Sequence, residues 1–265
     1  MNQSHTYRDI GVSRDGYVAT VEMRRPPHNF FDSELIAEIG EAFERLDGDP
    51  GCRAIVLAAE GRSFCAGADF SRRMETGTVS EGSRSAAGRH LYKEAIRLFR
   101  TKKPIVAAVH GAAVGGGLGL ACAADFRVAS PQARFCANFA RLGLHHGFAL
   151  TVTLPAIIGE QRALDLLVTG RRVGGEEAAR IGLADRLADP DGLRAAAQGL
   201  AAEIAACAPL AVRSIRETMR GTLADRARAA MERELAEQDR LRQTADFAEG
   251  IRASAQRRPP RFEAR

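Results

Sequence analysis

The first half of the chain alternates short apolar runs with longer amphipathic segments. The runs at 17–23, 53–60 and 104–110 have the length and composition of buried strands. Residues 32–47 place their apolar side chains on one helical face, with Asp32 as the predicted N-cap. That face consists of Leu35, Ile36, Ile39, Phe43 and Leu46. The alternation predicts an α/β fold.

Helical patterns dominate after two further strand-like runs at 125–130 and 133–138. Helices are expected at 149–170 and 174–182, and the chain is nearly all helix from about residue 191. We therefore predict a mixed core and a helical C-terminal region, which occupy residues 1–190 and 191–265. An apolar stripe along 223–243 is typical of a helix that covers the core or a neighbouring subunit.

Composition narrows the class of protein. The 265 residues are 45% hydrophobic and 27% charged, which is ordinary globular usage and argues against disorder. The net charge is +5, but the arginines are spread among acids and aromatic residues are only 6%. Because nucleic-acid surfaces combine basic runs with stacking rings, we expect no nucleic-acid partner.

The cysteines and the N-terminus indicate a reduced cytoplasm. Five cysteines without a C-x-x-C pair predict neither a disulfide framework nor a zinc site. The first residues lack the apolar core of a signal peptide. Residues 104–124 carry no formal charge, but they are mostly Ala and Gly and a triple glycine divides them. We therefore expect no membrane span.

The stretch 107–125, AAVHGAAVGGGLGLACAAD, combines five glycines with almost no side-chain chemistry. A strand that turns into a helix through glycines presents free N–H groups, which suit an anion. A dinucleotide fingerprint fits poorly because Cys122 stands at the third glycine, and a phosphate loop fails because Leu118 replaces its lysine.

An oxyanion hole is the third possibility, because a second glycine-bearing turn, FCAGAD at 64–69, follows the preceding strand. Two such turns at neighbouring strand ends could aim two amides at one oxygen. Tight backbone packing explains the glycines equally well, so spacing alone leaves both interpretations open.

Four segments in order resemble the crotonase superfamily, also called the enoyl-CoA hydratase/isomerase family. They are SFCAGAD (63–69), residues 104–130, residues 167–187 and TADFAEGIRAS (244–254). The resemblance implies a spiral of repeated β-β-α units, a helical C-terminal region and a homotrimer or a hexamer made of two trimers. It also implies an acyl-CoA substrate and an enolate-like intermediate. Coenzyme A is then part of the substrate, and no separate cofactor or metal is expected.

The resemblance assigns site residues by position. The oxyanion donors would be the backbone N–H groups of Ala68 and Gly116, and Ala66 would meet the adenine through its backbone. The remaining predicted substrate-binding residues are Gly67, Asp69, Ala112, Gly115, Gly117, Asn138, Phe139, Leu142 and Phe262.

The chain departs from the family pattern where protons are moved. The two glutamates of the hydratases match Gly119 and Phe139, and an aspartate position of some relatives matches Gly147. Without both carboxylates, the rate of ordinary hydration should be very low. His145 and His146 flank the third position and are candidate acid–base groups, with His146 preferred, although either could simply pack or form hydrogen bonds.

Other polar residues receive lesser roles. His110 is expected to be structural. His90 and Glu94 lie on a helix predicted to run to about Arg100, which borders the pocket in the resemblance, and either could reach substrate if that helix tilts inward. Cys65 has no evident base that would make it a nucleophile. Asp69 and Asp125 are expected to accept hydrogen bonds from turn amides. The candidates for coenzyme A phosphates are Arg72, Arg73, Arg257, Arg258 and Arg261.

The leading hypothesis is an acyl-CoA enzyme with an atypical proton-transfer set. Decarboxylation or C–C cleavage is an alternative, because losing a group generates the enolate without a strong base. The other alternative is a non-catalytic acyl-CoA-binding protein.

Overall fold

The computed structural model describes residues 6–69 and 90–265. The strands are β1 (Ile10–Asp15), β2 (Val18–Met23), β3 (Ala54–Ala59), β4 (Ser63–Cys65), β5 (Ile105–Val109), β6 (Ala112–Val114), β7 (Phe126–Ala129), β8 (Arg134–Cys136), β9 (Arg172–Gly174) and β10 (Arg186–Leu187). The α-helices are α1 (Ser33–Gly48), α3 (Leu91–Arg100), α4 (Gly116–Ala123), α5 (Leu150–Ile158), α6 (Glu160–Thr169), α7 (Gly175–Arg180), α8 (Leu193–Ala206), α9 (Pro209–Arg220), α10 (Leu223–Leu241) and α11 (Ala245–Ala255). Short 3₁₀ turns lie at Ala140–Leu142 and Pro190–Gly192.

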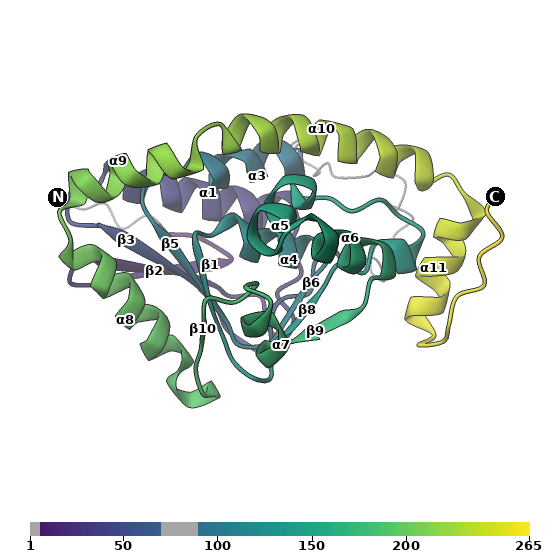
Figure 1. The fold of residues 1–265 in the computed structure, drawn as a ribbon, viewed down its shortest axis with the longest axis horizontal. Coiled ribbons are helices and arrows are strands. Elements are labelled where there is room, and N and C mark those ends of the chain that lie inside the picture. Colours follow the sequence, from purple (N-terminus) through teal and green to yellow (C-terminus); the bar gives the residue numbers. More distant parts are fainter. Residues whose placement is uncertain (1–5, 70–89) are drawn as a thin grey trace.

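The strands form two sheets that the chain visits in turn. The larger sheet has the order β1-β2-β3-β5-β7-β10, and the smaller has the order β4-β6-β8-β9. The pairs β3 and β4, β5 and β6, and β7 and β8 each place one strand in the large sheet and the next in the small sheet. Parallel pairing joins β2, β3, β5, β7 and β10, and also β4, β6 and β8. This winding confirms the predicted α/β class with repeated β-β-α units (Figure 1).

Alternating side chains give the large sheet two buried faces. Ile55, Leu57 and their neighbours join the main core with α1 and α3. Val56, Val106 and others pack instead under α8. Because successive strand residues point to opposite faces, one run of apolar residues serves both. The first helix of the region 191–265 therefore packs directly on the sheet.

Most predicted elements are found, with small differences at their ends. Asp32 caps α1 by accepting a hydrogen bond from the Leu35 N–H at 2.9 Å. The single helix expected at 149–170 is instead two helices, because Gly159 has φ +82° and ends α5. The three-residue strands β4, β6 and β9 were not expected, since so short a run shows no alternation.

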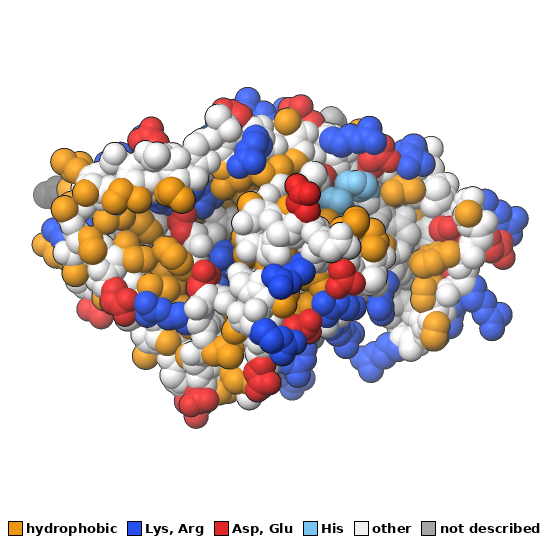
Figure 2. Space-filling model, viewed as in Figure 1, with side chains coloured by type: hydrophobic (Ala, Val, Ile, Leu, Met, Phe, Trp, Pro, Cys, Tyr) orange, Lys and Arg blue, Asp and Glu red, His pale blue; other side chains and the backbone are white. Residues whose placement is uncertain are grey.

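Two C-terminal helices differ in what they contact. Helix α10 lies over α3 and α5 and runs along one edge of the molecule (Figure 1). Helix α9 has no buried residue, and its Leu210, Ile215 and Met219 are 77%, 63% and 80% exposed. Figure 2 shows hydrophobic side chains gathered at the same end of the molecule, over α8 and α9.

No helix within 6–69 and 90–265 is by itself long and apolar enough to cross a membrane. Pro190–Ala206 and α9 reach that length and hydropathy only when they are taken together, and a bend of 107° separates them.

Candidate active site

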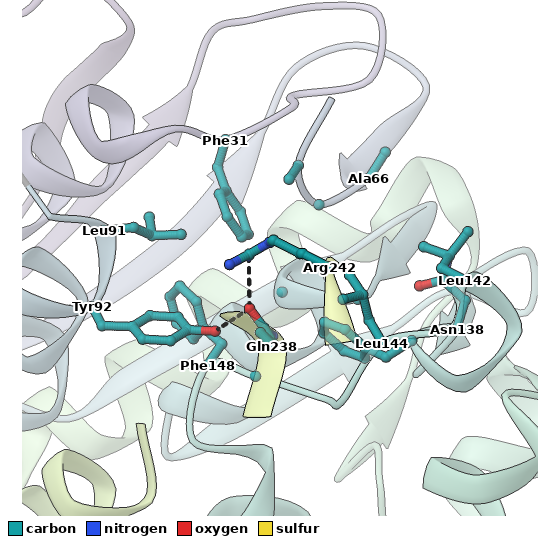
Figure 3. A pocket seen from close by; sticks show the side chains of 16 residues that line it. Phe31, Ala66, Leu91, Tyr92, Asn138, Leu142, Leu144, Phe148, Gln238 and Arg242 are labelled. Atoms are coloured by element: carbon teal, nitrogen blue, oxygen red, sulfur yellow. Dashed lines mark hydrogen bonds between the residues drawn. The ribbon is translucent and has the colours of Figure 1, made fainter. Parts of the chain in front are cut away.

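One pocket lies where the ends of β4 and β6 meet α3 and the last turn of α10 (Figure 3). Its empty volume, which includes part of the open mouth, is about 610 Å³. The lining residues are Phe31, Ala66, Gly67, Ala68, Leu91, Tyr92, Gly115, Gly116, Asn138, Phe139, Leu142, Leu144, Gly147, Phe148, Gln238 and Arg242. Its mostly apolar lining with a few polar groups is typical of a small-molecule site.

Two glycine turns form one side of this pocket. Gly67 has φ +83° and Gly115 has φ +58°, and residues with a side chain rarely adopt these backbone conformations. A Cβ atom at position 67 would lie 2.7 Å from the Val114 carbonyl oxygen and 3.7 Å from the Gly116 nitrogen. The two turns are therefore in contact. We call residues 66–68 and 115–116 the glycine floor.

The glycine floor presents two amides that the fold leaves free. The Ala66 N–H donates to the His28 carbonyl at 3.0 Å, and the Gly115 N–H donates to the Cys136 carbonyl at 2.8 Å. The N–H groups of Ala68 and Gly116 have no acceptor among the residues that the structure describes. Gly116 begins α4, so its N–H also lies at the positive end of that helix. Both groups line the pocket, where they can stabilise negative charge.

Bulky side chains fill the positions that the resemblance matches to catalytic carboxylates. A Cβ atom at Gly119 would lie 2.6 Å from the Phe148 Cβ. At Gly147 it would lie 2.1 Å from the Tyr92 hydroxyl oxygen. Phe139 lines the pocket itself. Among the described residues, the pocket lining therefore contains no aspartate, glutamate or histidine.

The two candidate histidines lie beside the pocket and do not line it. His145 Nδ1 is 2.8 Å from the His146 carbonyl oxygen, and the two rings stack with centroids 4.1 Å apart. His146 Nε2 is 2.8 Å from Thr151 Oγ1. Burial lowers the pKa of His146 to about 4, so the ring is neutral near pH 7. Their proposed acid–base role stays a prediction.

Three polar side chains from α3 and α10 cover the pocket opposite the glycine floor. Tyr92 donates from its hydroxyl to Gln238 Oε1 at 3.3 Å, and Arg242 donates from Nη2 to the same oxygen at 3.0 Å (Figure 3). We call Tyr92, Gln238 and Arg242 the polar roof. Sequence reasoning missed all three. The available signal was weak: Gln238 and Arg242 are four residues apart on a helix expected to cover the core, so they share one face.

Eight of the fourteen predicted site residues line this pocket. They are Ala66, Gly67, Ala68, Gly115, Gly116, Asn138, Phe139 and Leu142. Besides the two histidines, Asp69, Ala112, Gly117 and Phe262 are not in its lining. At Gly117 a Cβ atom would lie 2.0 Å from the Cys65 carbonyl oxygen, so this glycine permits close packing. Phe262 is 42% exposed on the C-terminal tail.

The lesser candidates have structural partners. His90 caps α3 by accepting from the Tyr92 N–H, and Glu94 pairs with Arg97 at 2.7 Å. The helix was thus identified correctly, but the neighbouring residues Leu91 and Tyr92 face the pocket. His110 Nε2 is 3.1 Å from the Gly61 carbonyl oxygen.

Other candidates are similarly occupied. Burial raises the pKa of Cys65 to about 12, which disfavours a thiolate, and all five cysteines are free. Asp125 accepts from the Ile105 N–H and pairs with Arg216 and Arg220 of α9. Arg258 pairs with Glu249. Arg72 and Arg73 lie outside the described residues, within which no cluster of three or more His, Cys, Asp or Glu could hold a metal.

Comparison with known proteins places the chain in a family. The family model for enoyl-CoA hydratase/isomerase matches residues 13–265. A Thermus thermophilus protein provisionally named enoyl-CoA hydratase is 37% identical over 255 residues, covering 93% of this chain and 98% of the relative. Carnitinyl-CoA dehydratase of Proteus mirabilis is 34% identical over 263 residues, covering 97% and 99%.

A solved structure supports the same family assignment. The crystal structure of an enoyl-CoA hydratase/isomerase from Pseudoalteromonas atlantica T6c superposes with a TM-score of 0.86 at 30% identity, covering 97% of this chain and all of that one. The family match, the relatives and the two-sheet spiral are consistent with one another. The chain belongs to the enoyl-CoA hydratase/isomerase family, within the crotonase superfamily.

Proposed function

We propose that this protein is an acyl-CoA thioester enzyme that stabilises an enolate at the glycine floor. The thioester oxygen would accept hydrogen bonds from the N–H groups of Ala68 and Gly116. The observation that carries this proposal is the pair of acceptor-free amides lining one pocket on two touching turns. Coenzyme A belongs to the substrate, so the reaction needs no separate cofactor.

The physical basis is the difference between ground state and transition state. Removing one preorganised oxyanion donor typically costs about 2.7–4 kcal/mol in barrier height. The positive φ angles of Gly67 and Gly115 fix the two turns in the fold, so the amides need not reorganise when charge develops. Two donors can thus supply a large part of the catalysis without any side chain.

A second candidate reaction is decarboxylation or C–C cleavage. It is favoured by the lack of aspartate, glutamate and histidine in the described pocket lining. When a β-carboxylate leaves as carbon dioxide, the electron pair of the broken C–C bond becomes the enolate. The α-carbon then takes a proton from solvent, so this route needs the oxyanion hole more than a base.

We also propose that the chain assembles as a homotrimer or as a hexamer of two trimers. Helix α9 supports this, because none of its residues is buried while Leu210, Ile215 and Met219 lie exposed. Large exposed apolar patches mark interaction sites. Sedimentation velocity at micromolar concentration tests this proposal, and a monomer would contradict it.

The reaction is tested with a panel of acyl-CoA thioesters. Exchange of C2 protons with deuterated solvent, followed by NMR, reports enolate formation from unbranched thioesters. Carbon dioxide release from malonyl-type thioesters reports decarboxylation. Exchange that falls in His146→Ala would support that histidine as the base, whereas exchange that persists would exclude it. Binding with neither reaction would leave a non-catalytic acyl-CoA-binding protein.

A further inference from the structure

Arg242 places a cation in the wall of a pocket whose other described lining residues are uncharged. Its side chain is only 9% exposed, and it is the one lysine or arginine among the lining residues that the structure describes. Its neighbours in the lining include Phe31, Leu91 and Phe148, which are apolar. A buried guanidinium is costly unless anions or acceptors satisfy it.

The protein satisfies Arg242 only in part. Nη1 donates to Asp239 Oδ1 at 2.7 Å, and Nη2 donates to Gln238 Oε1 at 3.0 Å. A guanidinium has five N–H groups, and these two bonds use two of them; no Arg242 nitrogen is both buried and unpaired in the described parts of the chain, so the other N–H groups are open to the pocket or to solvent. Asp239 is 59% exposed, and its charge is therefore largely screened by water.

Gln238 holds the guanidinium in a fixed position. Its Oε1 accepts from both Tyr92 and Arg242, and its Nε2 donates to the His145 carbonyl at 3.1 Å. These three contacts fix the amide orientation, and Gln238 and Tyr92 are only 4% and 9% exposed. Arg242 is thus preorganised, so ordering it costs little when a ligand binds.

The guanidinium and the glycine floor line the same pocket. Figure 3 shows the Arg242 side chain extending across the pocket toward Phe31. The Phe31 ring in turn covers Gly116, where a Cβ atom would lie 2.2 Å from Phe31 Cζ. A ligand held by the Gly116 N–H would therefore share one pocket with Phe31 and Arg242.

We propose that Arg242, supported by Gln238 and Tyr92, selects acyl thioesters whose acyl chain carries a second carboxylate. This deepens the proposed function and rests on it. A guanidinium suits a carboxylate because its N–H groups match the two oxygens. A coenzyme A phosphate fits less well, because it carries more charge and the described lining supplies a single cation.

Paired ligands test this selection. Dissociation constants are measured by calorimetry for ω-carboxyacyl-CoA esters of three to six acyl carbons and for the unsubstituted acyl-CoA of equal length. The enzymes are wild type, Arg242→Gln and the control Arg240→Gln, which loses the same charge from an exposed position on α10. Wild type and the control should prefer one or more dicarboxylic esters by about tenfold or more, and Arg242→Gln should lose that preference.

An acyl-CoA with a positively charged acyl group provides an independent test. An acyl-CoA ending in a quaternary ammonium group should bind wild type weakest and should bind Arg242→Gln more tightly, because the like-charge repulsion is removed. Circular dichroism of each variant confirms that it is folded, so that lost preference is not lost structure.

Two outcomes would overturn the selection. The first is equal binding of carboxylated and neutral chains by wild type. The second is an Arg242→Gln loss that is equal for all CoA esters and disappears with pantetheine thioesters, because that pattern identifies a phosphate contact. Either result leaves the proposed function intact. If wild type binds no acyl-CoA at all, the proposed function itself fails.

Discussion

The glycine floor and the polar roof face the same pocket but are built from different parts of the chain. The floor uses only main-chain groups, held by Gly67 and Gly115 at positive φ. The roof uses the side chains of Tyr92, Gln238 and Arg242, fixed by hydrogen bonds to one another. A floor of this kind can serve any thioester, whereas a roof of this kind can choose among acyl groups. Chemistry and selectivity should therefore be separable by mutation.

The floor should be the more sensitive region. In Gly67→Ala, the added Cβ would lie 2.7 Å from the Val114 carbonyl oxygen, and φ +83° is strained for alanine. We expect turnover to fall by about 10²–10³-fold, as for a lost oxyanion donor. The rate of C2 exchange or carbon dioxide release measures this. Gly174→Ala is the control, because a Cβ there meets nothing within 4 Å. Unchanged turnover in Gly67→Ala would separate the floor from the chemistry.

The attachment of the roof to the core depends on Glu234. This fully buried carboxylate on α10 accepts hydrogen bonds from the Ala149 N–H and from the N–H and hydroxyl of Thr151. Glu234→Ala leaves the buried Ala149 N–H without its acceptor and removes both bonds to Thr151, which is itself exposed, so the free energy of unfolding should fall by about 2 kcal/mol in urea titration. Glu232→Ala, exposed on the same helix, should change it by less than about 0.5 kcal/mol. Equal effects would show that Glu234 does not anchor the roof.

The loop between floor and roof should respond to pH through His146. Its pKa is about 4 in the fold, below the ordinary 6.5, because burial disfavours the charged ring. As pH falls below 6.5, the unfolded chain takes up a proton that the folded chain refuses. Stability should therefore decrease, by on the order of 2 kcal/mol by pH 5. Urea titrations at pH 7.5 and 5 should show a smaller decrease in His146→Asn, and an identical decrease would contradict the low pKa.

Removing one hydroxyl from the roof should have the smallest effect. The Tyr92 hydroxyl donates to Gln238, so Tyr92→Phe should lower the free energy of unfolding by about 1 kcal/mol. Tyr17→Phe, about half exposed, serves as control. Turnover should stay within about tenfold of wild type, and a loss of 10²-fold or more would instead identify Tyr92 as a proton donor.

The two regions also differ in how far the sequence reveals them. Glycine clusters after strands are local signals, so residues 64–69 and 107–125 could be identified before the structure was known. The roof joins Tyr92 to Gln238, which are 146 positions apart, and no local pattern links them. Likewise, the helical spacing of 32–47 predicted α1 and its Asp32 cap, whereas nothing in the spacing indicated that His145 and His146 are not among the pocket-lining residues. Side-chain direction in a loop depends on tertiary packing.

The proposed oxyanion hole consists of the Ala68 and Gly116 N–H groups. A crystal structure of the protein with a stable analogue of an acyl-CoA enolate would show whether both groups bind the enolate oxygen. We expect the analogue's oxygen to lie about 2.7–3.1 Å from both the Ala68 and the Gly116 nitrogen atoms. An oxygen that contacts neither amide, in an otherwise ordered complex, would contradict it.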